Sequence, residues 1–172
     1  MKRVISYVLL ILVFFLIQNN IFAASSLIMT VPNLLMILVF SFGFIRGSLE
    51  GMLIGFFCGL LNDLFFGNTI GFTALMYSVL GYGMGLIGNL YYTDFVNLPL
   101  LLCLFSILIY HIGIYVFAFL INGYGSFGSY LGNVALPELL YTGIMTLLLY
   151  PLIRRVEELI QKWESRKARN YA

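Results

Sequence analysis

Long apolar stretches with few charges between them constrain the fold of this chain more than any other feature of its sequence. Only 9% of the 172 residues are charged and 62% are hydrophobic, with a mean hydropathy of +1.01. Soluble domains carry about 25% charged residues, because their surface is solvated by water. A chain of this composition matches lipid as its solvent. The sequence therefore predicts one all-α integral membrane domain.

Turn-forming residues divide the apolar stretches into six segments of the length that a membrane requires. A bilayer core of about 30 Å needs about 20 helical residues. Glycine, proline and asparagine residues lie at the joints between the segments. The predicted transmembrane spans are residues 4–23, 28–45, 49–66, 70–90, 98–121 and 133–153. We therefore expect a six-helix bundle over residues 1–153 and a basic amphipathic tail over residues 154–172.

The nine basic residues predict how this bundle is oriented. Lys2 and Arg3 precede the first span, Arg46 lies between the second and third, and the other six follow the sixth. With six spans and both termini in the cytoplasm, every basic residue lies on the inner side, as the positive-inside rule requires. The predicted location is a cytoplasmic (inner) membrane that the chain crosses several times, with both termini cytoplasmic.

The first segment has a second interpretation. Lys2 and Arg3, the apolar run and the small residues at positions 23–26 also resemble a secretory signal peptide. Ile21 or Phe22, however, occupies the position where cleavage needs a small residue. Retention of the first span is the favoured interpretation, and cleavage would leave the other five spans oriented as before.

The tail continues the sixth span with a helical pattern. Val156, Leu159, Ile160 and Trp163 recur at helical spacing among charged residues, which predicts an amphipathic helix entering the cytoplasm. A basic helix of this kind can lie on anionic lipid headgroups or bind a protein. Contact with membrane lipids is the favoured interpretation.

Glycines recur every fourth residue in the third and fourth spans. Gly51, Gly55 and Gly59 occupy one face of the third span, and Gly81 and Gly85 occupy one face of the fourth. Each glycine costs a soluble helix about 1 kcal/mol relative to alanine. In lipid, small residues compensate because they let two helix backbones approach closely. We predict that these glycines form a helix-packing surface or a contact for a partner.

A glycine motif in the fourth span resembles a nucleotide-binding fingerprint. Gly83, Gly85 and Gly88 form G-x-G-x-x-G, but the fingerprint needs a preceding strand and a βαβ unit. Within a membrane span this spacing predicts helix packing instead.

Two acidic residues lie near the predicted outer ends of their spans, Asp63 in the third and Glu138 in the sixth. Ionisable groups in a membrane usually face the bundle interior or a cavity. Each acid either caps a helix end or belongs to a proton or ligand path. For Glu138, in the first turn of its span, capping is favoured by the helix dipole. Asp63 is expected to lie away from any helix N-terminus, so both interpretations stay open.

Three other polar residues are candidates for a function. Arg46 and Glu50 are four residues apart across the predicted inner turn, where they form either a helical ion pair or a loop clamp. His111 lies in the middle of the fifth span. A single membrane histidine is predicted to bond a neighbouring helix rather than to catalyse a reaction.

The sequence offers little support for an enzyme. It contains no phosphate-binding loop, no H-E-x-x-H and no G-x-S-x-G motif, and only one histidine. Cys58 and Cys103 lie in apolar runs without metal-ligand spacing and are predicted to be buried and free. We therefore expect no catalytic residues, no metal, no cofactor and no nucleic-acid partner.

An ordered set of short motifs runs through about residues 15–90. The set comprises Gln18 at the end of the first span, V-P-N-L-L-M-I-L-V at 31–39, R-G at 46, E-G at 50, G-x-x-x-G-L-L-N-D at 55–63 and G-N-T-I-G-F-T-A-L at 67–75. This ordered set resembles the bacterial rod-shape-determining MreD family. The rest of the chain is similar in span count, length and basic tail.

This resemblance implies a non-enzymatic membrane subunit of the bacterial cell-elongation machinery. Its expected partner is MreC, with MreB, RodA and a class B penicillin-binding protein in the same assembly, which supports lateral peptidoglycan synthesis. The chain is also similar in size and span count to the substrate-binding subunits of energy-coupling-factor transporters, which implies a shared six-helix fold. The alternative function is therefore a solute-binding subunit of a vitamin-type transporter. The A-x-x-x-A pair expected in the first span of such subunits is absent, which counts against this alternative.

Overall fold

The computed structural model describes residues 2–22, 31–66, 70–90, 97–122 and 127–169. Within these ranges the regular structure is helical and contains no strand. The elements are α1 (Lys2–Leu16), the π-helical turn η1 (Ile17–Phe22), α2 (Leu34–Arg46), α3 (Ser48–Phe66), α4 (Phe72–Leu90), α5 (Asn97–Asn122), the short α6 (Phe127–Tyr130), the π-helical turn η2 (Leu131–Ala135) and α7 (Leu136–Arg169).

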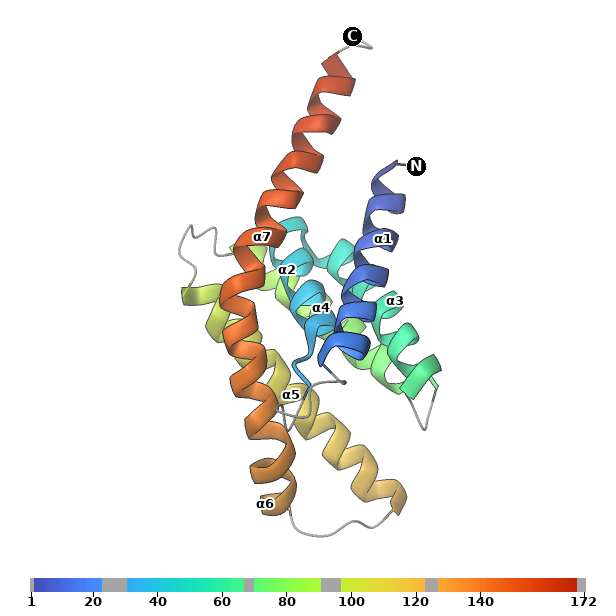
Figure 1. The fold of residues 1–172 in the computed structure, drawn as a ribbon, viewed down its shortest axis with the longest axis vertical. Helices are drawn as coiled ribbons and strands as arrows, with labels where there is room; N and C mark the ends of the chain where they lie inside the picture. Colours follow the sequence, from blue (N-terminus) through green and yellow to red (C-terminus); the bar gives the residue numbers. More distant parts are fainter. Residues whose placement is uncertain (1, 23–30, 67–69, 91–96, 123–126, 170–172) are drawn as a thin grey trace.

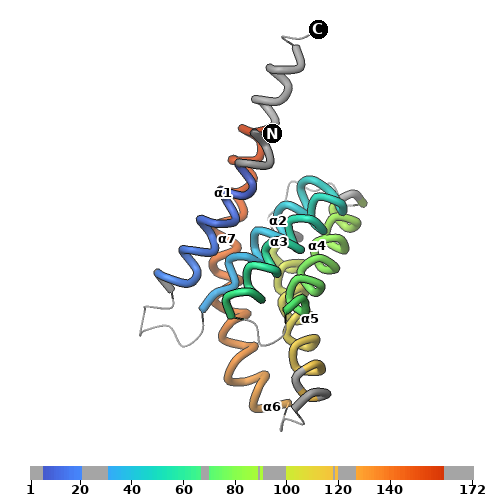
Figure 2. The backbone as a smooth tube through the Cα atoms, turned by 90° about the vertical axis from the view of Figure 1, so that its right-hand side faces the viewer, coloured from blue at the N-terminus to red at the C-terminus, as the bar shows by residue number. Residues whose placement is uncertain are grey.

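The long helices alternate in direction along the chain, and the start of α1 and the end of α7 lie at the same end of the molecule (Figures 1 and 2). Arg46 at the end of α2 also lies at this end, beside Glu157 of α7. We call it the basic end, defined by Arg46, Arg154 and Arg155. At this end α7 extends beyond the other helices (Figure 1).

Three helical segments in the described part of the chain are long and apolar enough to cross a membrane: Ser48–Phe66, Leu100–Phe117 and Phe127–Ile160. Three further apolar segments are shorter: Ser6–Asn20, Leu34–Arg46 and Phe72–Gly88. The helices α3, α4 and α5 begin and end within two residues of the predicted spans. The turn-forming residues between the apolar segments were therefore sufficient to locate these three helices in the sequence.

The central helix α2 differs from its prediction. It begins at Leu34, whereas the predicted span began at residue 28, and residues 31–33 are not helical. The cause is local, because the side chain of Asn33 caps the helix by accepting a hydrogen bond from the Met36 amide at 3.0 Å. With 13 residues, α2 is about 20 Å long and shorter than a bilayer core. Residues 28–30 lie outside the described residues.

Nearly the whole of α2 is enclosed by the other helices. Every residue from Leu34 to Gly43 is buried, and α2 packs against α3, α4 and α7. In Figure 1 it lies behind α7 at the centre of the molecule. An apolar helix enclosed all round is a core element, so α2 is the helix around which the bundle is built.

The predicted glycine surface joins α3 to α4 within the chain. A Cβ atom at Gly51 would clash with the backbone of Gly81, one at Gly55 with the carbonyl group of Tyr77, and one at Gly59 with the backbone of Ala74. Small residues thus allow backbone-to-backbone contact, as expected in lipid. This surface faces α4 and α2 and is therefore not exposed to other molecules.

The other glycines of α4 divide into two groups. A Cβ atom at Gly85 would meet the backbone of Ser48, and one at Gly88 the backbone of Phe44. Gly83 has nothing within 4 Å of the position that its Cβ atom would occupy. Gly85 and Gly88 therefore face helix backbone, whereas Gly83 takes part in no such contact within the described ranges of the chain.

The predicted tail helix is the continuation of α7 to Arg169. Glu157 is fully buried against Arg46, whereas Leu159 is 58% exposed. An exposed leucine on this helix agrees with the favoured contact with membrane lipids, which stays a prediction. The side chain of Trp163 lies outside the described residues.

Candidate functional site: a polar cavity at the start of α2

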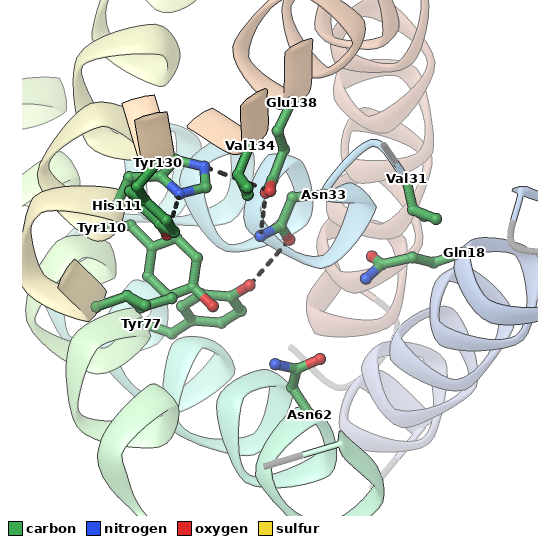
Figure 3. A pocket seen from close by; sticks show the side chains of 11 residues that line it. Gln18, Val31, Asn33, Asn62, Tyr77, Tyr110, His111, Tyr130, Val134 and Glu138 are labelled. Carbon is green, nitrogen blue, oxygen red and sulfur yellow. Dashed lines mark hydrogen bonds and ion pairs between the residues drawn. The ribbon is translucent and has the colours of Figure 1, made fainter. Parts of the chain in front are cut away.

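A cavity of about 260 Å³ lies where α2 begins. Its lining comes from nearly every element of the described bundle (Figure 3). The lining residues are Gln18, Val31, Asn33, Asn62, Tyr77, Tyr110, His111, Ile114, Tyr130, Val134 and Glu138. We call this space the polar cavity, because amide, phenol, imidazole and carboxyl groups form most of its wall.

Asn33 connects three helices at the wall of the polar cavity. Its Oδ1 atom, which caps α2, also accepts a hydrogen bond from the Tyr77 hydroxyl of α4 at 2.9 Å. Two acceptors lie on α7. The Nδ2 atom of Asn33 donates to Glu138 Oε1 at 3.3 Å, and the backbone N–H of Asn33 donates to Thr142 Oγ1 at 3.1 Å. The side chain is buried, with 6% exposed. One residue thus fixes the start of α2 to α4 and to α7.

Glu138 and His111 form the adjacent part of the wall. The Oε2 atom of Glu138 lies 3.3 Å from His111 Nε2, and His111 Nδ1 lies 3.0 Å from the Tyr130 hydroxyl. His111 is 3% exposed. A carboxyl group away from water needs hydrogen-bonding partners, and Glu138 accepts one such bond from Asn33 and lies beside the His111 ring. His111 on α5 bonds Tyr130 of α6, in agreement with its prediction.

Aromatic rings close another side of the polar cavity. The ring centroids of Tyr77 and Tyr110 are 5.2 Å apart, and those of His111 and Tyr130 are 6.0 Å apart. Tyrosine presents an apolar ring and a polar hydroxyl, so these rings provide both packing surface and hydrogen-bonding groups. Figure 3 shows the Tyr77 and Tyr110 hydroxyl groups at the edge of the space.

Two amide side chains lie opposite this wall. Gln18 Oε1 accepts a hydrogen bond from the Leu35 N–H at 3.1 Å, so η1 satisfies a free donor in the first turn of α2. Asn62 of α3 approaches from another direction, and both amides point towards the space (Figure 3). The eleven lining residues include one carboxyl group and no lysine or arginine. This lining can recognise polar groups by hydrogen bonding.

Sequence reasoning found Glu138 and His111 but missed most of this wall. Asn33 carried a signal, because an asparagine after a proline and before an apolar run is a typical helix start. No sequence signal indicated that Tyr77, Tyr110 and Tyr130 line the cavity. Their direction depends on how the helices are rotated against one another, which spacing within one helix does not reveal.

Asp63 serves a different purpose from Glu138. Its carboxylate accepts hydrogen bonds from the backbone N–H groups of Gly71 at 2.9 Å, Thr73 at 3.2 Å and Ala74 at 3.0 Å. Asp63 is 1% exposed. It therefore caps the N-terminus of α4. The expectation that it lies away from any helix N-terminus is wrong, because the first turn of α4 packs against the end of α3.

Comparison with known proteins identifies the chain. The sequence model of the rod shape-determining protein MreD matches residues 1–161. The chain belongs to the MreD family. Neither a curated protein nor a solved structure matches it. It is therefore a rod-shape-determining membrane protein of a family that is structural and is not a known enzyme family.

In this member of the MreD family, the predicted polar residues lie in three separate places. Glu138 and His111 line the polar cavity, Asp63 caps α4, and Arg46 pairs with Glu157 at the basic end. Glu50 lies in the first turn of α3, and the predicted clamp between Arg46 and Glu50 stays a prediction. The polar cavity is a concave feature that combines buried polar groups with space for another molecule.

Proposed function

We propose that this chain is a non-enzymatic membrane subunit of the bacterial cell-elongation machinery. It helps to maintain rod shape by binding MreC, and it thereby supports lateral peptidoglycan synthesis with MreB, RodA and a class B penicillin-binding protein. The observation that carries this proposal is the match to the MreD family over residues 1–161. Partners are expected for a member of a structural family, because such a protein acts through what it binds.

In this proposal the helices α1 to α5 and α7 cross the bacterial cytoplasmic membrane, with both termini in the cytoplasm. Two observations support it. The helices alternate in direction with both chain ends at the basic end, and basic residues favour the cytoplasmic side. Residues 1–153 then form the membrane domain, and residues 154–172 form a cytoplasmic tail against lipid headgroups. The polar cavity lies towards the outer side.

We further propose that MreC docks at the polar cavity and not at the glycine surface. Gly51, Gly55 and Gly59 already face backbone atoms of this chain, so a partner cannot use them without opening the bundle. The cavity presents amide, phenol and carboxyl groups beside open space, and lipid tails offer no donors or acceptors to such groups. A protein segment with its own donors and acceptors can bond to them.

A pair of matched substitutions tests this docking site in rod-shaped cells whose own copy is replaced. Val134→Trp places a large ring at the wall of the cavity, and Val79→Trp places the same ring on the exposed face of α4, where Val79 is 59% exposed. We expect Val134→Trp to reduce the MreC that co-purifies after crosslinking by about tenfold, equivalent to about 1.4 kcal/mol, and to round the cells.

Val79→Trp serves as the control and is expected to retain both MreC and rod shape. Equal protein abundance in the membrane fraction excludes a folding defect as the cause. Undiminished MreC recovery with Val134→Trp would exclude the cavity as the docking site. If MreC does not co-purify with the wild-type chain under the same conditions, this result would count against MreC as the partner.

The volume and polar lining of the cavity also favour a second candidate, a solute-binding subunit of a vitamin-type transporter. A space of about 260 Å³ approaches the size of small-molecule sites. Thermal unfolding of the purified chain with a panel of water-soluble vitamins tests this candidate. A vitamin that raises the unfolding temperature of the wild type but not of Val134→Trp would support it. No rise with any vitamin would count against it.

A further inference from the structure

The helix α2 is bonded to α7 at both of its ends. At the polar cavity, Asn33 donates hydrogen bonds to Glu138 at 3.3 Å and to Thr142 at 3.1 Å. At the basic end, Arg46 forms an ion pair with Glu157, whose side chain is 1% exposed. Glu138 and Glu157 lie 19 residues apart on one helix, or about 28 Å. Two distant polar contacts therefore join the same two helices.

The segment of α2 between these contacts is tightly enclosed. All residues from Leu34 to Gly43 are buried, and close-packed interiors transmit displacement instead of absorbing it. Phe40 and Tyr150 pack their rings 6.1 Å apart between the two helices. A shift of α2 at its start therefore displaces its other end as well.

The contact at the basic end favours two discrete arrangements. Glu157 and most of Arg46 are shielded from solvent, with 1% and 12% of their side chains exposed. Separating such a pair within the bundle leaves a buried charge without its counter-charge, which is strongly unfavourable. A shift that separates the pair therefore has to bring both groups to water, and an intermediate separation within the bundle is disfavoured. A contact of this kind can act as a two-state element in conformational coupling.

We propose that α2 and α7 form a coupling unit that transmits changes at the polar cavity to the α7 extension at the basic end. A group that bonds Glu138 or Asn33 in the cavity competes with the bonds between α2 and α7. The resulting shift of α2 moves Arg46 relative to Glu157. The α7 extension is released when this ion pair opens and is held when the pair stays closed. The inference goes beyond the proposed function, and it holds whichever molecule enters the cavity.

Distances between two spin labels at the basic end test this coupling in the full chain in lipid nanodiscs. Leu49→Cys on α3 and Leu159→Cys on α7 provide the label sites, because these residues are 68% and 58% exposed. The native Cys58 and Cys103 are each 0% exposed. Electron-spin measurement of the label separation then reports the position of the α7 extension. The labelled chain is compared with Glu157→Gln, Glu138→Gln and Asp63→Asn.

We expect Glu157→Gln to broaden the distance distribution, because it opens the contact directly. Glu138→Gln is expected to broaden it as well, from the opposite end of α7. Asp63→Asn, a buried substitution of the same kind outside the unit, is expected to leave it unchanged. The coupling is overturned if Glu138→Gln gives the wild-type distribution, if Glu157→Gln does so, or if Asp63→Asn broadens it equally.

A second measurement covers the case in which Glu138→Gln does not fold. Thr142→Val removes the acceptor of the Asn33 N–H and keeps the volume of the side chain. Combined with Glu157→Gln in a double-mutant cycle, it is expected to lower the unfolding temperature by less than the sum of the two single effects. Strict additivity, which is normal for residues this far apart, would overturn the coupling. Co-purification of MreC is measured separately, so failure of the proposed docking site is distinguishable from failure of the coupling.

Discussion

The contact of α3 with α4 and the contacts of α5 with its neighbours are built on different principles. Glycines between α3 and α4 face backbone atoms, as Gly55 faces the Tyr77 carbonyl group. Glycines around α5 face the ends of side chains. A Cβ atom at Gly143 of α7 would lie 3.1 Å from Leu104 Cδ2, and one at Gly113 would meet the side chain of Met76. Backbone atoms cannot move aside, whereas a leucine or methionine end can change rotamer.

Polar groups divide between the two regions in the same way. The α3–α4 contact uses its buried acid, Asp63, to cap a helix. The contacts around α5 hold Cys103 with Thr146 at 3.3 Å and His111 with Glu138, and the polar cavity lies beside them. The difference indicates a rigid half, built on the α3–α4 contact, and an adaptable half around α5, and the polar cavity lies between them because Asn62 of α3 and Tyr77 of α4 also line it.

The largest expected difference in the free energy of unfolding comes from replacing one glycine by alanine in each of the two regions. We expect Gly55→Ala to lower the free energy of unfolding by about 3 kcal/mol or more, because its Cβ atom meets a carbonyl group that cannot move. Gly143→Ala is expected to change it by less than about 1 kcal/mol, since Leu104 can adjust and alanine favours the helix. Denaturant unfolding of the purified variants in detergent measures both.

Two further variants calibrate this comparison. Gly55→Leu is expected to prevent stable insertion, and Gly83→Ala, whose Cβ atom meets nothing within 4 Å, is expected to be neutral or stabilising. Equal losses for Gly55→Ala and Gly143→Ala would show that the two contacts are equally rigid and would remove the distinction between the two halves.

The next effect concerns the cap of α4. Asp63→Ala leaves the N–H groups of Gly71, Thr73 and Ala74 without their acceptor, and we expect a loss of about 2–3 kcal/mol in the free energy of unfolding. Asp63→Asn retains one acceptor oxygen and is expected to lose about half as much. A smaller loss for alanine than for asparagine would contradict the capping role and favour a path for protons or ligands.

The rigid half was largely predictable from the sequence. The four-residue spacing of Gly51, Gly55 and Gly59 is a local pattern, and a smooth helix face in lipid has few uses other than close packing. The end of α3 was not predictable in the same detail. Asp63 meets the start of α4 only because of how α4 packs against the end of α3, and Gly71, just before α4, has a positive φ of 99°.

The polar cavity was the least predictable part. Its wall combines Gln18, Asn33, Tyr77, His111 and Glu138 from five elements, and no pair of these residues shares a sequence motif. Only the cap at Asn33 had a local signature, in the P-N dipeptide before an apolar run. The rotation of each helix is determined by the packing of all the others, so the direction of a tyrosine in an apolar helix follows from the whole bundle.

A smaller effect tests whether the wall of the cavity is held by its hydrogen bonds. Tyr77→Phe removes the bond to Asn33 Oδ1, and we expect a loss of about 0.6–1 kcal/mol, the usual value within membranes. Tyr82→Phe on the same helix is the control, because Tyr82 is 42% exposed. Thermal unfolding of both variants measures the difference. No loss for Tyr77→Phe would indicate that ring packing alone holds the wall.

The smallest expected effect compares how often the two halves open. Cys58 in α3 and Cys103 in α5 are both 0% exposed, so each reacts with a membrane-permeable maleimide only when its surroundings open transiently. We expect Cys103 to react severalfold faster than Cys58 after both rates are divided by those of the denatured chain. Each rate is measured in a variant in which the other cysteine is replaced by alanine. Faster reaction of Cys58 would reverse the assignment of the rigid and adaptable halves, because the glycine contact would then be the one that opens first.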